Sequence, residues 1–65
     1  MEIGDRVKIN PIKRSEYINI MPGSYGAELL RNTFSGSGTI TLLFGSFAEI
    51  DHVYNVPVPV LEIIK

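Results

Sequence analysis

The feature that most constrains this chain is its lack of any cross-linking chemistry. It has 65 residues, no cysteine and a single histidine, His52. A domain this small buries only about 60% of the surface of its unfolded chain, so small domains usually add disulfides, a metal or a partner. Disulfides are excluded, and one histidine among scattered carboxylates does not make a zinc site. We therefore expect one domain over residues 1–65, without metal or cofactor, that is stabilised by apolar packing or self-association.

Alternation of apolar and polar residues predicts short β-strands. Val7 and Ile9 alternate with Arg6 and Lys8, and Asn10-Pro11 ends this strand because proline lacks the backbone donor. The same reasoning predicts later strands over residues 39–44, 47–51, 52–56 and 61–64.

Turn residues set the connections between these strands. Gly45-Ser46 predicts a two-residue hairpin with glycine first, which would place Ala48 and Ile50 inward on the return strand. Pro57 and Pro59 forbid a regular central strand, so residues 56–60 are interpreted as a 3₁₀ turn. Residues 11–37 show no sustained period and are predicted to be a long, irregular first loop, with one turn of helix formers at residues 27–31. Long loops are often functional, so we place most of the specificity there.

The order of these pieces resembles the SH3-like β-barrel superfamily. Gly4-Asp5-Arg6-Val7 is similar to its opening strand, Gly38-Thr39-Ile40 to its second strand, and Val60-Leu61-Glu62-Ile63-Ile64 to its closing strand. The resemblance implies an all-β fold, namely a small five-stranded SH3-like barrel with a long first loop and a 3₁₀ turn before the last strand.

The departures from known members concern function. The chain has no tryptophan and no Ala-Leu-Tyr-Asp-Tyr segment, with which peptide-binding SH3 domains hold polyproline. Type II dihydrofolate reductases place a Val-Gln-Ile-Tyr run in a central pore, and the counterpart here, Val56-Pro57-Val58-Pro59, lacks the glutamine and the tyrosine. The resemblance therefore predicts the fold, but it predicts neither polyproline binding nor dihydrofolate reductase activity.

No residue cluster indicates a catalytic site. His52 follows Asp51, but neighbouring residues in a strand point to opposite faces, so we expect no direct contact between them. Ser35-Gly36-Ser37-Gly38 lacks the lysine and the following helix of a phosphate loop and is interpreted as a flexible turn.

The aromatic residues are the more informative set. We expect Phe34 or Phe44 in the core, and a binding face near the long loop with arginines at its rim. The predicted binding residues are Arg14, Tyr17, Tyr25, Arg31, Phe47 and Tyr54.

The primary hypothesis is a non-enzymatic interaction module that binds a protein partner or forms a homo-oligomer. A nucleic-acid-associated barrel is an alternative, favoured by Arg6, Lys8, Lys13, Arg14 and Arg31 and opposed by the net charge of −1. An oligomeric small-molecule binder or sequestering protein of phage or plasmid type, including an enzyme at an oligomeric pore, is another. No run approaches the roughly 20 apolar residues of a membrane span, so we expect no membrane partner and a cytoplasmic setting.

Overall fold

The centre of the fold is a long strand that pairs with different neighbours along its length. In the computed structural model, which describes all residues 1–65, five strands form one antiparallel sheet in the order β4-β3-β2-β1-β5. The strands are β1 (Arg6–Ile9), β2 (Ser37–Phe44), β3 (Phe47–Ile50), β4 (Tyr54–Pro57) and β5 (Leu61–Ile63). The prediction of five short strands is confirmed, with ends that differ by up to a few residues.

Strand β2 changes partner near its middle. Its first residues pair with β1, as in Thr39 opposite Arg6, and its later residues pair with β3, as in Ile40 opposite Ile50. The register shifts between Ile40 and Leu42, which is the signature of a β-bulge, and bulges bend the strand that carries them. No pairing joins the outer strands β4 and β5, so the sheet is open.

The core lies on one face of this bent sheet. It contains the apolar residues Val7, Leu30, Ile40, Ala48, Ile50, Val56, Val60 and Leu61. The inward positions predicted from alternation are confirmed, because Val7, Ala48 and Ile50 are fully buried while Arg6 and Lys8 are exposed.

The segment predicted as a long irregular loop contains two helices, so that prediction was wrong. They are α1 (Pro11–Ile20) and α2 (Tyr25–Arg31). Both begin at capping residues whose side chains accept hydrogen bonds from backbone N–H groups that the helix leaves unpaired. Asn10 Oδ1 accepts from the N–H of Ile12 and Lys13 at 2.9 and 3.1 Å, and Ser24 Oγ accepts from that of Ala27 at 3.1 Å.

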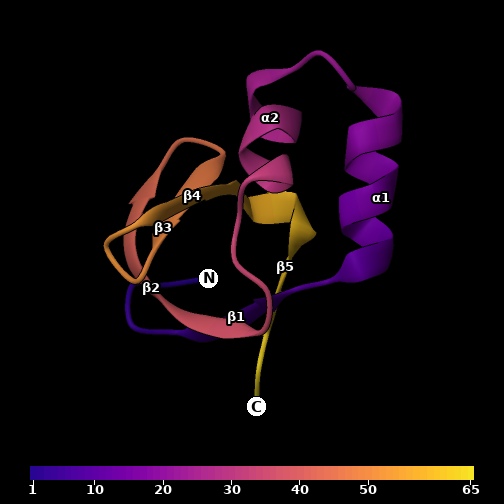
Figure 1. Cartoon of the computed structure of the whole chain (residues 1–65). Helices are drawn as coiled ribbons and strands as arrows, with labels where there is room; N and C mark the ends of the chain where they lie inside the picture. Colours follow the sequence, from indigo (N-terminus) through magenta and orange to yellow (C-terminus); the bar gives the residue numbers. More distant parts are fainter.

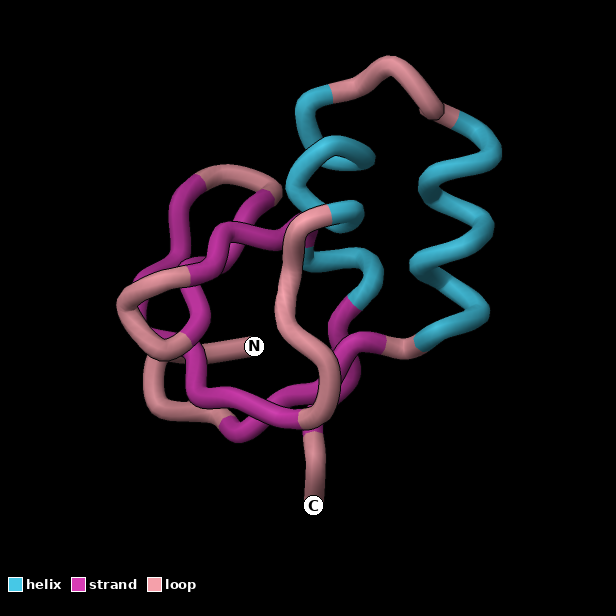
Figure 2. Tube along the Cα trace, in the orientation of Figure 1, coloured by secondary structure: helices cyan, strands magenta, loops and turns pink.

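The helices gather on one side of the molecule, and the strands lie on the other (Figure 2). Helix α2 packs against β4, and α1 packs against α2 and the 3₁₀ turn η1 (Val58–Val60), which places α1 on the outside (Figure 1). The ring of Tyr17 lies against Gly26, where a Cβ would meet its Cζ at 2.9 Å, so glycine permits the close approach of α1 to α2. Neither helix has the length and apolar character needed to cross a membrane.

Most of the turns lie where the glycine and proline residues predicted them. The Gly45-Ser46 hairpin is confirmed, with Gly45 at a φ of 59°, and so is the 3₁₀ turn before β5. Pro57 ends β4, which is an edge strand, as proline requires. The strand predicted over residues 52–56 begins only at Tyr54, because Asp51 and His52 both adopt positive φ and form the turn between β3 and β4.

Replacing Asn10 with alanine tests how much the N-cap of α1 contributes to stability. Removal of both side-chain hydrogen bonds should lower the free energy of unfolding by about 1 kcal/mol, measured by chemical denaturation. Asn19→Ala, at an exposed position in the last turn of the same helix, is the matched control and should not lower it. Equal effects of the two substitutions would contradict the role of Asn10.

Replacing Gly38 with alanine tests the close contact between β2 and the end of β3. An added Cβ would overlap the Ile50 side chain and lie 2.9 Å from Asp51 Oδ2, and Ile50 is fully buried. We expect the free energy of unfolding to fall by about 1–3 kcal/mol. Gly23→Ala meets nothing within 4 Å and should leave stability unchanged or slightly raised, so a similar loss in both variants would be evidence against this contact.

Candidate functional site

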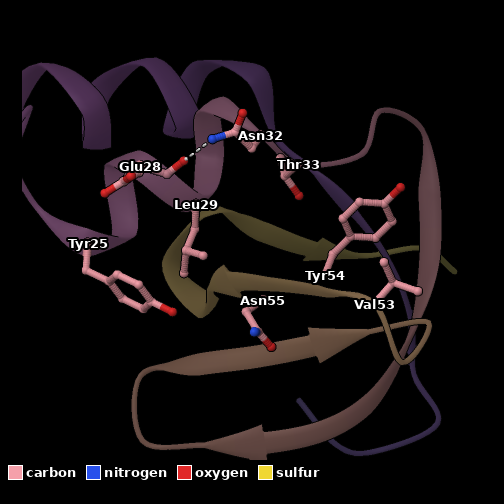
Figure 3. Close-up of a pocket in the computed structure, with 8 residues that line it drawn as sticks. All are labelled: Tyr25, Glu28, Leu29, Asn32, Thr33, Val53, Tyr54 and Asn55. Atoms are coloured by element: carbon pink, nitrogen blue, oxygen red, sulfur yellow. Dashed lines mark hydrogen bonds between the residues drawn. The ribbon is translucent and has the colours of Figure 1, made fainter.

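A cleft of about 300 Å³ separates α2 from the beginning of β4, and we call it the α2 cleft (Figure 3). One wall comes from α2 and the two residues after it: Tyr25, Glu28, Leu29, Asn32 and Thr33. The other wall comes from the β3–β4 turn and β4: Val53, Tyr54 and Asn55.

Helical spacing explains the first wall. Tyr25, Glu28, Leu29 and Asn32 stand at positions i, i+3, i+4 and i+7, which share one face of a helix. The Ser24 cap fixes where the helix begins, and the opposite face carries the fully buried Leu30 into the core. The sequence therefore divides α2 into one side for packing and one side for the cleft.

The polar groups of the cleft suit hydrogen bonding more than charge pairing. The Asn32 side-chain amide donates to the Glu28 carbonyl oxygen at 3.3 Å, which caps the last turn of α2 (Figure 3). Thr33 Oγ1 is buried and has no hydrogen-bond partner within the chain. Glu28 is the only charged residue in the lining. The Thr33 hydroxyl is therefore free to pair with a hydrogen-bonding group that enters the cleft, since buried hydroxyls are normally paired.

A row of aromatic rings continues from the cleft along the outer face of the sheet, with Tyr25 and Phe44 exposed and Phe47 half-buried between them, and we call these three residues the aromatic row. The Tyr25 and Phe47 ring centroids are 5.9 Å apart in a T-shaped arrangement, and those of Phe47 and Phe44 are 6.2 Å apart. Phe44 and Phe47 are direct cross-strand partners beside the Gly45-Ser46 turn. Tyr25 is 65% exposed and Phe44 43%, so the row presents a large apolar area to its surroundings.

Three of the predicted binding residues are brought to this region. Tyr25 and Phe47 lie in the aromatic row, and Tyr54 lines the α2 cleft. The Tyr54 ring packs against that of Phe34 in a tilted arrangement, with the ring centroids 5.2 Å apart. Phe34 packs against the core, as one of the two expected alternatives, while Phe44 is exposed.

The other predicted binding residues hold the helices together. Arg14 donates from Nη2 to the Leu30 carbonyl oxygen at 2.9 Å, and Arg31 donates from Nη2 to that of Pro22 at 2.8 Å. The Tyr17 ring fills the space beside Gly26. None of these three side chains lines the α2 cleft.

The remaining polar candidates take part in local structure. The Asp51 carboxylate accepts from the Thr39 N–H at 3.0 Å, and His52 Nδ1 lies 3.7 Å from a Glu49 carboxylate oxygen. The Thr41 hydroxyl donates to the same carboxylate at 2.9 Å and accepts from the His52 N–H at 3.1 Å. These contacts tie the bulge of β2 to the β3–β4 turn.

Several residues of the cleft were missed by sequence reasoning: Glu28, Leu29, Asn32, Thr33, Val53 and Asn55. The α2 wall could have been predicted from the sequence, because an N-cap residue precedes residues at helical spacing. These are Ser24, and then Tyr25, Glu28, Leu29 and Asn32. The opposite wall depends on where α2 docks and has no local signal.

We compared the chain with models of protein families, with curated proteins and with solved structures. None of the three comparisons found a match.

Proposed function

We propose that this protein is a small, non-enzymatic interaction module that binds an extended segment of a protein partner. The segment would lie across the aromatic row and enter the α2 cleft. The observation that carries the proposal is the position of Tyr25, which is 65% exposed and belongs to both surfaces. A single side chain thus joins an apolar surface to a cleft with hydrogen-bonding walls.

The aromatic row supplies the apolar contact. Aromatic rings offer large contact area at low cost in side-chain entropy, and tyrosine is enriched among the residues that dominate binding energy. Phe47 lies between Tyr25 and Phe44, and its contacts with both limit the movement of the row before a partner arrives. Leu42, 46% exposed and two residues before Phe44, extends the same face.

The charges near this surface favour a particular kind of segment. Glu28 lines the cleft, and Glu49 lies opposite Leu42 on the outer face of the sheet. No lysine or arginine lines the cleft. A segment with an apolar anchor followed by a lysine or arginine would be complementary, and an acidic segment would be repelled.

The architecture proposed for this module is that of the SH3-like barrels. Support comes from the bend of β2 between two partner strands and from the 3₁₀ turn that precedes the last strand. The two helices would replace the long first loop of that fold. Its partner-binding face would then include α2, which lines the cleft.

The nucleic-acid alternative gains no specific support from the positions of the cations. Arg6 donates to the Thr39 and Ser37 hydroxyls, Lys8 lies 3.4 Å from the Glu62 carboxylate, and Arg14 and Arg31 bind backbone carbonyls. Arg6 and Lys8 lie on β1, Arg14 lies on α1 and Arg31 on α2, and each already has a partner within the chain, so none is left unpaired for a phosphate backbone.

Selection of a random peptide library on the immobilised protein tests the proposal. We expect enriched peptides with an apolar anchor next to a basic residue, and we expect Tyr25→Ala to weaken their binding by about tenfold or more. The measurement is a fluorescence titration of selected peptides against each variant. Because Tyr25 is mostly exposed, its loss should leave the fold intact, which circular dichroism checks.

Ile12→Ala is the matched control, since Ile12 is 69% exposed but lies on α1, away from the cleft. Its affinity should equal that of the unmodified protein. The proposal would be wrong if no peptide were enriched, or if Tyr25→Ala and Ile12→Ala behaved alike. A concentration-dependent dimer, seen by light scattering and dissolved by Phe44→Ser, would instead assign the surface to a second copy of the chain.

A further inference from the structure

Arg14 is a half-buried cation without an anionic partner. Its Nε and Nη2 atoms donate to the Leu30 carbonyl oxygen at 3.3 and 2.9 Å, and its Nη1 group has no partner within the chain. The two ion pairs of the protein, Lys8–Glu62 and His52–Glu49, lie elsewhere. Nη1 is not buried, so its N–H groups are open to an oxyanion that arrives from solution, and hydrogen bonds between a guanidinium and an oxyanion are among the stronger ones.

A second cleft, of about 330 Å³, opens beside this side chain, and we call it the Arg14 cleft. Its apolar lining comes from Ile9, Pro11 and Phe34, and its polar lining from Thr33 and the Ser35-Gly36 turn. Arg14 is the only charged residue in the lining. The formal charge of its lining is therefore positive, whereas that of the α2 cleft, which contains Glu28, is negative.

The composition of the lining specifies the class of anion. One guanidinium balances one negative charge, and its planar arrangement of N–H groups matches a carboxylate. A phosphate dianion would leave charge uncompensated, because no second cation lines the cleft. The apolar walls would contact an aliphatic or aromatic body attached to the carboxylate.

We propose that the Arg14 cleft binds a carboxylate that carries a short apolar group. The carboxylate accepts hydrogen bonds from Arg14 Nη1, and the apolar group contacts Ile9 and Phe34. The carboxyl terminus of a peptide and a small free carboxylic acid present the same chemistry. This site uses different residues from the aromatic row and does not depend on the function proposed above.

Nuclear magnetic resonance titration of the labelled protein tests this site, with N-acetyl-leucine as the probe and N-acetyl-leucinamide as its uncharged match. We expect the acid to shift the backbone amide signals of Arg14, Phe34, Ser35 and Gly36 saturably in the millimolar range, and the amide to bind about tenfold more weakly or not at all. A short peptide ending in leucine, with a free or an amidated terminus, distinguishes the two sources. Tighter binding of the free-terminus peptide than of the acid would indicate a peptide terminus, and equal binding a small acid.

Three variants show whether Arg14 is responsible. Arg14→Gln should abolish the shifts, and Arg31→Gln, which removes an exposed arginine outside the cleft, should preserve them. Because Arg14→Gln also removes the bonds to Leu30, Ser35→Asp serves as a second variant. Ser35 is exposed, and a carboxylate there should compete for Arg14 while the helix contacts stay in place.

The proposal is overturned if the amide binds as well as the acid. It is also overturned if no saturable shift occurs up to the solubility of the probe, or if folded Ser35→Asp protein binds the acid as the unmodified protein does.

Discussion

The structure depends on β2 serving two ladders. Its first half holds β1 and, through β1, the closing strand β5, while its second half holds β3 and β4. Ile40 lies at the change of partner: its N–H donates to the Asp5 carbonyl oxygen at 3.0 Å, its carbonyl accepts from Gly4 at 2.8 Å, and its side chain faces Ile50. The bulge that follows bends the strand, so both parts of the sheet face one core. Val7 from β1 and Val56 from β4 accordingly lie in the same core cluster.

Strands and turns could be predicted because their signals are local. Alternation placed Val7, Ala48 and Ile50 inward, and Gly45-Ser46 and the prolines placed the turns. Helix α1 was missed because it has no fully buried residue, and because Ile12 and Ile20 are both strongly exposed while Tyr17 and Ile18 pack against the core. Apolar residues on both sides of a helix obscure its period. The Asn10-Pro11 pair, interpreted as the end of a strand, is equally an N-cap followed by proline in the first helical turn.

The candidate site was less predictable than the sheet because it is made by docking. Aromatic residues in the first loop and near the hairpin indicated a binding face, and Tyr25 and Phe47 do meet. Their contact depends on α2 lying against β4, which no local pattern specifies. The arginines expected at the rim bind backbone carbonyls: Arg14 pairs with that of Leu30, which the end of α2 leaves unpaired, and Arg31 pairs with that of Pro22 in the connection between the helices. Sequence charge alone does not distinguish that role from a role in binding a partner.

The two clefts meet at the end of α2 and share a residue there. Arg14 holds the Leu30 carbonyl, while the Leu30 side chain is fully buried in the core, so this turn of the helix is fixed from both sides. Thr33, three residues later, lines both clefts. Arg14 thus lines one cleft and also bonds to the last turn of the helix that forms a wall of the other. A helix of seven residues gains little stability from its own hydrogen bonds, so its stability depends on these tertiary contacts. The arginine that sequence reasoning assigned to the rim of a binding face is therefore a support for one cleft and the only charge of the other.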